Sequence, residues 1–347
     1  MSSVGVQVEE VISVLPHNNS DNLELAIILG WQSVVQKNTI KPGDRVLYLP
    51  PDTMMREEIA DLLNIKKYLK FSSHYDMYRV SGIRLRGEPS FGAIISLNTI
   101  PENFIIQENL DKIFSKYQPP EIYKDTSGTI VKQWRNFPIY TDIENIRNFP
   151  DILMENEQVV ITEKIHGMCT RIGYIKNPET SIHEFVCGSH KLQRSLDSIW
   201  GTPLKEEKYK NLLKQLSNSN SEDIIVYGEL FGRGIQDMDY GFLTKPEFRV
   251  FDISKNGVYL DKVVLPSLLI SFDIPMVPIL TITEWNNNLI QEFSDGETTV
   301  NEKDKIQSSF KGREGIVITP LFERSYPKIG RVIFKSVSVD YLQRKEK

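Results

Sequence analysis

The stretch VVITEKIHGMCT at residues 159–170 constrains this chain more than any other. Its β-branched apolar residues predict a buried strand, and Lys164 stands at the end of that strand. Because side chains alternate along a strand, Lys164 and His166 should share one face. Gly167 would let the backbone bend or let a ligand approach closely. The pattern predicts a nucleophilic lysine held beside a phosphate.

The bulk composition limits the class of protein. With 347 residues, 40% of them apolar and 25% charged, the chain resembles a globular protein with room for two domains. It has no apolar run of about twenty residues and no signal-peptide pattern at its start, so we expect no membrane span and no secretion. Cys169 and Cys187 are too few for a disulfide framework or a four-cysteine zinc site, which favours an intracellular location. The net charge of −5 argues against nonspecific coating of nucleic acid, but it does not exclude a locally basic groove.

Residues 1–115 predict a domain of short strands separated by turns, and we favour a five-stranded OB-type β-barrel. The segment Val11–Lys37 resembles the opening pattern of OB modules, with PHNNSDNLELA followed by GWQSVV. Such modules bind single strands or duplex backbone through one face. A β-domain with a purely structural role is the alternative.

Residues 116–145 contain Pro119, Pro120 and Pro138 and predict a linker. Residues 146–347 predict a second domain, with helices near 141–148, 204–217 and 285–295. Its predicted strands do not alternate regularly with these helices, so an α+β fold is favoured over a doubly wound parallel sheet. The strands are expected at 157–164, 170–176, 184–188, 223–230, 247–253, 314–319 and 331–337.

Lys164 would need activation, because a lysine ammonium has an ordinary pKa of about 10.4 and is a poor nucleophile at neutral pH. Neighbouring cations, a metal ion or desolvation lower such a pKa. Attack of the amine on an α-phosphate would then give a reactive phosphoramidate that passes the nucleotide on. A surface lysine after a strand is the plainer interpretation of this residue alone.

Two further strand ends carry polar groups. The stretch CGSHK, residues 187–191, has small polar and basic side chains that could hold a ribose or phosphate, or could form an ordinary turn. Glu229 lies within IIVYGELFG, between Gly228 and Gly232. Because a carboxylate in an apolar strand should not be buried without a partner, Glu229 is a candidate for a ribose hydroxyl or a metal-bound water.

The remaining candidates complete a nucleotide site. Phe251 precedes Asp252, a pairing that suits stacking on a base, although a core phenylalanine is equally consistent. Glu314 begins an apolar strand and Lys335 ends another. Since Mg²⁺ prefers oxygen ligands, Glu229 and Glu314 with a cation nearby would suit a nucleotide–Mg²⁺ complex.

The order Lys-x-His-Gly, Gly-Glu, Phe-Asp, Glu-Gly-Ile-Val and Lys resembles the covalent nucleotidyltransferase superfamily of ATP-dependent ligases and capping enzymes. Within it, EKIHG resembles the nick-sealing, second-type phage RNA ligases, whereas DNA ligases usually have Asp at the position of His166. The resemblance implies an OB domain followed by a nucleotidyltransferase (adenylation) domain of antiparallel sheets with flanking helices.

This resemblance implies a role for each matching residue. Lys164 would be the adenylated nucleophile, and His166 and Lys335 would act near the phosphate. Glu229 and Glu314 would hold Mg²⁺ or Mn²⁺, and Phe251 and Val317 would sandwich the adenine. The implied ATP and AMP contacts are Glu163, Lys164, Gly167, Ser189, Lys191, Glu229, Phe251, Val317 and Lys335.

Two motifs depart from the resembled family. Where Ser-Arg is common, this chain has Ser189-His190-Lys191, so the role of the arginine falls to Lys191 or Arg194. Where the last motif is Lys-x-Lys, Ile333 replaces the first lysine. Either Arg331 compensates, being on the same face by alternation, or one phosphate contact is absent.

The implied activity is ATP-dependent joining of RNA 3′-hydroxyl and 5′-phosphate ends, at nicks in an RNA duplex or an RNA–DNA hybrid, by a monomer. The alternatives are a DNA ligase, a capping guanylyltransferase or a non-catalytic RNA-binding protein. The first two groups carry a further OB domain after the last lysine motif, and the twelve residues after Lys335 are too few for one. The third would be expected to lose Lys164, Glu229 or Glu314, and all are present.

Overall fold

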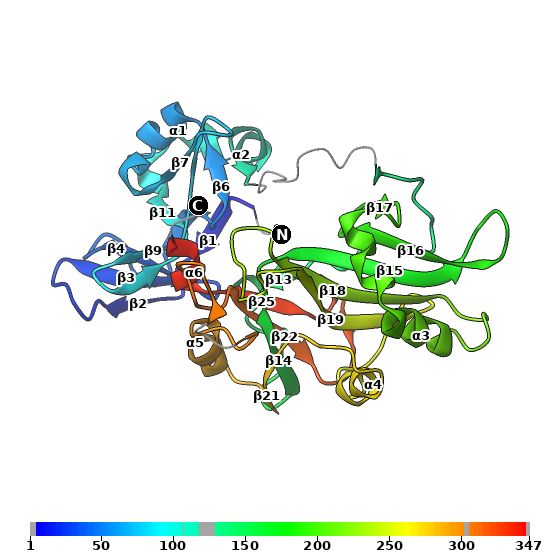
Figure 1. Ribbon diagram of the computed structural model, residues 1–347. Coiled ribbons are helices and arrows are strands. Elements are labelled where there is room, and N and C mark those ends of the chain that lie inside the picture. Colours follow the sequence, from blue (N-terminus) through cyan, green and yellow to red (C-terminus); the bar gives the residue numbers. More distant parts are fainter. Residues whose placement is uncertain (1–4, 106, 118–128, 302–304, 345–347) are drawn as a thin grey trace. The chain divides into compact units, whose positions relative to one another are not determined.

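The computed structural model describes residues 5–105, 107–117, 129–301 and 305–344, and the chain forms two compact units (Figure 1). The first unit comprises Met1–Glu121, Glu144–Asp151 and Leu342–Arg344. The second comprises Ile122–Ile143, Ile152–Tyr341 and Lys345–Lys347. Among the described residues, no helix has the length and apolar character required to cross a bilayer.

The first unit consists of short antiparallel strands, as its closely spaced turns predict, although the strands are shorter and more numerous than the expected five. One sheet has the order β1 (Gln7–Glu10), β5 (Arg45–Leu49), β11 (Ala93–Ser96), and another has β2 (Ser13–Pro16), β3 (Leu23–Ile28), β4 (Trp31–Gln36). A third has β12 (Ser115–Lys116), β6 (Thr53–Met55), β8 (Met77–Arg79), β7 (Lys70–Ser72), and β10 (Glu88–Ser90) pairs with β9 (Ile83–Leu85). The helices of this unit are α1 (Glu57–Leu62) and α2 (Gln107–Ile113).

The segment Glu144–Asp151 belongs to the first unit, although the sequence places 146 onward in the second domain. The indole N–H of Trp31 donates to the Asn148 side chain at 2.7 Å, and the Gly30 N–H donates to the Arg147 carbonyl at 2.8 Å. A Cβ at Gly30 would lie 2.9 Å from Arg147 Cα, so glycine permits this close approach. The helix predicted near 141–148 is wrong: the chain forms a short strand, β13 (Glu144–Asn145), and one 3₁₀ turn, Ile146–Asn148.

The predicted linker, 116–145, is more than a spacer. Its residues 118–128 lie outside the described part of the chain. From residue 129 on, it contributes Phe137 and Tyr140, which are 0% and 3% exposed, to a hydrophobic cluster of the second unit. Pro138 lies in irregular backbone, as predicted, but proline content does not report whether the neighbouring aromatic side chains are buried.

The second unit contains two antiparallel sheets, which agrees with the predicted α+β fold. The larger sheet has the order β17 (Gln193–Arg194), β16 (His183–Ser189), β15 (Met168–Lys176), β18 (Ile224–Gly232), β19 (Pro246–Lys255), β20 (Val258–Tyr259). The smaller sheet includes, in order, β25 (Phe334–Val337), β22 (Gly315–Pro320), β14 (Gln158–Lys164), β21 (Ile279–Glu284). A separate pair is formed by β23 (Ser325–Tyr326) and β24 (Gly330–Arg331).

The predicted strands of this unit are all present within a few residues. Of its helices, α3 (Glu207–Leu216) and α5 (Asn288–Ser294) match the predicted segments. The sequence analysis did not anticipate α4 (Leu265–Ser271), α6 (Val339–Gln343) or the strand β21. A short apolar run can form either a helix or a buried strand, which is why α4 gave no distinct signal.

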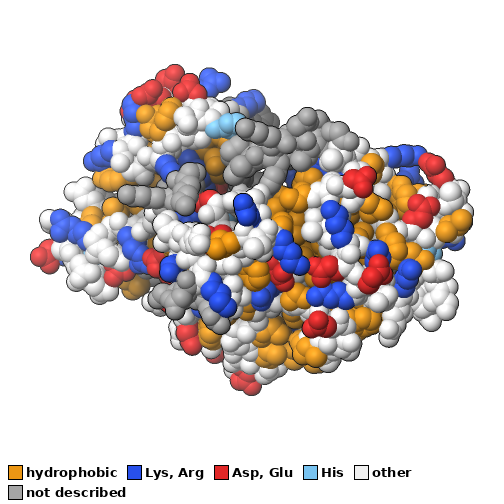
Figure 2. Space-filling model, viewed as in Figure 1, with side chains coloured by type: hydrophobic (Ala, Val, Ile, Leu, Met, Phe, Trp, Pro, Cys, Tyr) orange, Lys and Arg blue, Asp and Glu red, His pale blue; other side chains and the backbone are white. Residues whose placement is uncertain are grey.

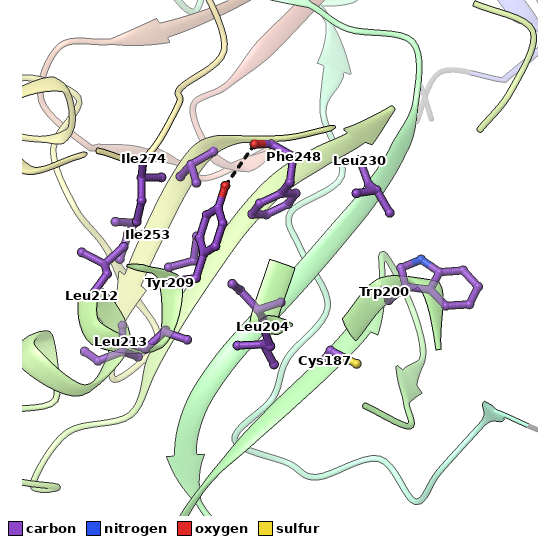
Figure 3. Packing of buried hydrophobic residues seen from close by; sticks show 14 of the residues in the cluster. Cys187, Trp200, Leu204, Tyr209, Leu212, Leu213, Leu230, Phe248, Ile253 and Ile274 are labelled. Atoms are coloured by element: carbon purple, nitrogen blue, oxygen red, sulfur yellow. Dashed lines mark hydrogen bonds between the residues drawn. The ribbon is translucent and has the colours of Figure 1, made fainter. Parts of the chain in front are cut away.

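One face of the larger sheet is an apolar core. Residues of β15, β16, β18 and β19 pack there against α3 and α4 (Figure 3). Tyr209 of α3 is buried in this core, and its hydroxyl donates to the Phe248 carbonyl at 3.2 Å, the bond drawn in Figure 3. Packing against α3 and α4 holds this face of the sheet in place, so the opposite face is available for a site.

The opposite face carries a mixed cluster. It includes Tyr227 from β18, Phe137 and Tyr140, with Phe251 from β19 and Val317 from the smaller sheet packed against them. The second face of the larger sheet therefore meets residues of the smaller sheet. The candidate site lies among these residues.

Candidate active site

Lys164 is the last residue of β14, where it lies opposite Gly315 of β22. Glu314 immediately precedes β22, so strand pairing brings the two side chains together. Lys164 Nζ lies 2.8 Å from Glu314 Oε1, and the side chains are 25% and 13% exposed. The predicted nucleophile therefore contacts the predicted metal ligand.

The environment of Lys164 stabilises the ammonium form. Burial lowers its pKa, but the carboxylates of Glu314 and Glu229 more than offset this effect and leave the pKa raised. The surrounding side chains by themselves therefore do not produce the expected lowering of the Lys164 pKa. Activation of this amine requires that the negative charge of the two carboxylates be neutralised.

Glu229 lies in β18 opposite Cys169 of β15. Burial, together with the nearby Glu314, raises its pKa to about 8, although Lys164 and a hydrogen bond from the Gly167 N–H act in the other direction. A Cβ at Gly167 would lie 2.4 Å from the Leu230 carbonyl oxygen. Glycine is thus required here because β18 approaches closely, and this approach brings Glu229 toward Lys164.

The two carboxylates suit a divalent cation. Glu314 Oε2 is buried and has no hydrogen-bond partner among the residues that the structure describes, and Glu314 lies near enough to Glu229 to raise its pKa. Hard cations bind carboxylate oxygens, and Mg²⁺ keeps several other ligands as water or phosphate. Within the described ranges no group of three or more His, Cys, Asp or Glu side chains is arranged to hold a metal. Water or phosphate oxygens would have to complete the coordination shell.

His166 is held from two sides. Its Nε2 lies 2.8 Å from Asp237 Oδ1 and its Nδ1 lies 2.8 Å from the Tyr341 hydroxyl. Its backbone N–H donates to the Tyr240 hydroxyl at 2.8 Å, and Nδ1 is 4.0 Å from Glu314 Oε2. Because a carboxylate only accepts, Nε2 carries the proton donated to Asp237, and Nδ1 is hydrogen-bonded to the Tyr341 hydroxyl. The ring is therefore fixed beside the lysine.

Phe251 and Val317, the predicted adenine sandwich, contribute to the same hydrophobic cluster from different sheets. The pairing of β18 with β19 shifts at this point: Tyr227 lies opposite Asp252 and Gly228 lies opposite Val250. Phe251 is therefore the extra residue of a β-bulge. A bulge re-aims a side chain, and strict alternation along β19 does not describe its orientation.

Lys335 lies in β25 directly opposite Val317, which in turn lies opposite Thr162 of β14. Paired residues project from the same face of a sheet, and Thr162 shares its face with Lys164 two residues on. Register thus places Lys335, Val317 and Lys164 on one face, as the predicted site requires. Lys335 is half-buried.

Glu163 points away from that face and is 1% exposed. Its carboxylate accepts hydrogen bonds from the Thr298 hydroxyl and, at 2.7 Å each, from the backbone N–H and hydroxyl of Thr299. The side chain is thus occupied by the 298–299 segment. A contact of this residue with a base would use its backbone.

The Ser189 motif forms a tight turn at the end of β16, in which the Ser189 N–H donates to the Leu192 carbonyl at 2.9 Å. Lys191 is exposed on this turn, whereas Arg194 is 4% exposed and stacks on Trp200 at 4.6 Å. Of the two predicted substitutes for the family arginine, Arg194 is buried against the core. Lys191 retains an accessible charge.

The sequence leaves two alternatives for the lysine missing at Ile333: either Arg331 replaces it, or one phosphate contact is absent. The guanidinium of Arg331 donates to Asp252 at 2.9 and 3.1 Å and to Glu323 at 2.8 Å, and its side chain is 7% exposed. Ile333 is buried in the mixed cluster. The arginine is thus engaged with two carboxylates inside the protein.

Three contacts escaped the sequence analysis: those of Asp237 and Tyr341 with His166, and that of Lys262 with Asp252. Asp237 follows β18 in an irregular segment, and Tyr341 lies in α6, 175 residues from the histidine. One sequence feature could have pointed to the Asp237 contact: Asp237 and Asp239 lie close together, beside the Gly-rich stretch after Glu229. The segment around Asp237 also lines a cavity of about 490 Å³ together with Gly232, Arg233, Gly234, Gln236, Met238, Asp239, Leu243 and Gln307.

Comparison with known proteins identifies the family and the fold. Residues 157–337 match the RNA ligase family and residues 5–97 match an OB-fold domain. No curated protein sequence matches the chain. Among solved structures, a mutant of the Naegleria gruberi RNA ligase with ATP and Mn superposes with a TM-score of 0.75 at 22% identity, covering 97% of this chain and 98% of the other. The same ligase with PPi gives 0.75 at 22% identity, with 97% of each chain covered. A further mutant, with AMP and Mn, gives 0.74 at 22% identity over 97% of this chain and 98% of the other.

These structural matches show that the chain has the same fold, an OB-fold unit followed by a nucleotidyltransferase unit. The family match covers more than half of the sequence and includes Lys164, Glu229, Glu314 and Lys335. The chain belongs to the RNA ligase family.

Proposed function

We propose that this ligase uses ATP to join an RNA 3′-hydroxyl to a 5′-phosphate through a covalent Lys164–AMP intermediate. The observation that carries the proposal is the convergence of Lys164 and Glu314, which the pairing of β14 with β22 brings together, with Glu229 from the larger sheet. The solved Naegleria gruberi ligases contain ATP or AMP with Mn. They support ATP as the substrate class by analogy of fold.

In the first step, the neutral Lys164 amine attacks the α-phosphorus. A P–N bond forms as the nitrogen releases one of its two remaining protons to solvent, the bond from the α-phosphorus to its bridging oxygen breaks, and pyrophosphate leaves with the bonding electron pair. The proton that Lys164 carries in the ligand-free protein must depart first, and Glu314 lies at 2.8 Å to accept it. In the next steps AMP moves to the RNA 5′-phosphate, and the 3′-hydroxyl displaces AMP.

Glu229 and Glu314 would hold Mg²⁺ or Mn²⁺, which when bound supplies positive charge that offsets the phosphates and favours the neutral lysine. Phe251 and Val317 would enclose the adenine, with the backbone of Glu163 and Gly167 along its edge. Lys335 would contact the α-phosphate, since it shares the face of Lys164. Ser189 and Lys191 would contact the ribose or the other phosphates.

The substrate we propose is a nick in an RNA duplex or RNA–DNA hybrid, sealed by an intracellular monomer. His166 supports the proposal that the substrate is a nick, because the resembled nick-sealing RNA ligases have a histidine at this position. On the face drawn in Figure 2, positive and negative side chains are interspersed, which favours local phosphate contacts over a broad basic field. The first unit would contact the sugar–phosphate backbone of the nucleic acid through its OB-type sheets.

Incubation with α-labelled ATP and Mg²⁺ tests the first step. The full-length protein should become covalently labelled, and Lys164→Ala should not. Lys176→Ala is a matched control, because Lys176 also ends a strand of this unit but is exposed. Labelling from GTP in preference to ATP would favour a capping enzyme, and absence of label from either nucleotide would refute the proposal.

A set of nicked duplexes with RNA or DNA on each side of the nick tests the substrate. Sealing should require RNA at the 3′-hydroxyl side and should proceed with an RNA or a DNA template. Efficient sealing of all-DNA nicks would instead indicate a DNA ligase. Equal joining of unpaired single strands would contradict the preference for nicks.

A further inference from the structure

Beside the adenine-facing residue Phe251 lies a buried set of charged groups that the proposed chemistry does not use. Asp252 is 0% exposed, and burial alone would raise its pKa. Lys262 and Arg331 instead lower its pKa to about 2. The carboxylate is therefore ionised inside the protein, and both of its oxygens are hydrogen-bonded.

Lys262 bridges this carboxylate to the bulge. Its Nζ donates to Asp252 Oδ1 and also, at 2.7 Å, to the backbone carbonyl of Phe251. Phe251 has no partner in the register of β18 and β19, since Tyr227 pairs with Asp252 and Gly228 with Val250. A bulge leaves backbone groups without ladder partners, and here a buried ammonium satisfies the carbonyl.

Arg331 completes the set from the other side. It donates to both oxygens of Asp252 and to Glu323, whose own N–H donates to the Asp261 carboxylate at 2.7 Å. Two carboxylates, Asp252 and Glu323, thus face two cations, Lys262 and Arg331. The buried set is electrically balanced, which is the condition under which such groups are tolerated.

Tyr140 links the set to the aromatic ring itself. Its hydroxyl hydrogen-bonds Asp252, and its ring centroid lies 5.0 Å from that of Phe251 at an interplanar angle of 55°. The Phe251 residue is consequently held at its carbonyl by Lys262 and at its ring by Tyr140. Both contacts are anchored on the same carboxylate.

We propose that Lys262 is a positioning residue for nucleotide binding: with Asp252 and Arg331 it fixes the bulge that presents Phe251 to the base of ATP. The proposal rests on the assignment of Phe251 to the adenine site. Purely for stability, an apolar side chain in place of Lys262 and its partners would serve as well. The specific contribution of the ammonium is its bond to the carbonyl of the bulged residue.

The test is a double-mutant cycle on lysyl-AMP formation by the full-length protein, with KM for ATP and kcat measured separately. Lys262→Met should raise KM about tenfold, the usual cost of losing a charged hydrogen bond, and should change kcat less than about threefold. In Phe251→Ala the ring is absent, so adding Lys262→Met should raise KM no further. Lys255→Met is the matched control, because Lys255 ends β19, the strand that contains Phe251, but pairs with Glu222 at the surface.

The proposal is overturned if Lys262→Met leaves KM unchanged, lowers only kcat, or multiplies the effect of Phe251→Ala. If Lys262→Met does not fold, Tyr140→Phe decides, because it removes only the hydroxyl bonded to Asp252 and keeps the ring beside Phe251. That variant should raise KM about threefold, the usual cost of one hydrogen bond, and an unchanged KM would overturn the proposal. Absence of label in the wild-type protein would instead refute the proposed function itself.

Discussion

Two lysine–carboxylate pairs in the second unit differ in how completely their atoms are satisfied. In the Lys164–Glu314 pair, one carboxylate oxygen accepts from the lysine, and the other has no hydrogen-bond partner within the described part of the chain. In the Lys262–Asp252 pair, Arg331 and Tyr140 bond the remaining oxygen sites and both side chains are buried. The first pair can exchange its partners for a ligand, whereas the second has no site left for one.

The Lys164–Glu314 pair belongs to the proposed reactive site, whereas the Lys262–Asp252 pair holds a residue next to that site. Near Lys164, two carboxyl groups share one lysine: they raise the pKa of Lys164, whereas burial, followed by the nearby Glu314, raises the pKa of Glu229. An incoming divalent cation would complete this set of charges. Around Asp252 the charges balance and the carboxylate stays ionised. An incomplete hydrogen-bond network, in which an acceptor is still open, can bind a ligand. A complete network, whose groups are all bonded, holds the neighbouring residues in place.

The largest expected effect comes from the incomplete pair. Lys164→Arg should reduce covalent labelling at least about a thousandfold, because a guanidinium stays protonated and cannot act as the nucleophile. It can still pair with Glu314, so the free energy of unfolding should change by less than about 1 kcal/mol. Labelling assays and urea denaturation measure the two quantities. Labelling of Lys164→Arg near the wild-type level would show that another residue is the nucleophile.

In the complete pair the effect should fall on stability. Asp252→Asn should lower the free energy of unfolding by about 3–5 kcal/mol, because Lys262 and Arg331 lose their buried counter-charge. Urea denaturation at pH 7 measures it. The matched change in the incomplete pair, Glu314→Gln, should cost less than about 1 kcal/mol while abolishing sealing. Equal losses of stability in the two variants would remove the distinction.

Acid titration sharpens the comparison. The pKa of Asp252 is about 2 in the folded protein and 3.8 ordinarily, so its ionised form stabilises the fold above pH 3.8. That stabilisation is lost as the pH falls through 3.8 toward 2, a change of about 2 kcal/mol. The stability difference between wild type and Asp252→Asn should therefore shrink between pH 5 and pH 2. A constant difference over this range would show that Asp252 does not titrate as described.

The smallest effect concerns the divalent cation. At about ten times its Kd, Mg²⁺ should raise the free energy of unfolding of the wild-type protein by about 1.4 kcal/mol. Thermal unfolding with Mg²⁺ and with a chelator measures the shift. The shift should disappear in Glu314→Gln, which lacks half of the proposed site, and persist in Lys255→Met. A shift that survives Glu314→Gln would place the cation elsewhere.

Much of the fold followed from local patterns. The strands that carry Lys164, Glu229, Phe251, Val317 and Lys335 are where the sequence predicts them, because β-branched runs and alternation are local properties. The helix predicted at 141–148 failed for a related reason. Its residues are amphipathic enough for a helix, but the chain there packs against Gly30 and Trp31, which lie far away in the sequence.

The site divides in the same way. The sequence alone determined the type and order of the chemical groups: a lysine and a histidine on one face, two glutamates, an aromatic and a second cation at strand ends. Only the tertiary structure decided that Asp237 and Tyr341 hold His166, that Lys164 pairs with Glu314, and that Arg331 serves Asp252. Alternation fixes which way a side chain points within one strand. Partners more than 70 residues apart are set by how strands pair and where a bulge interrupts them, and no local pattern encodes that.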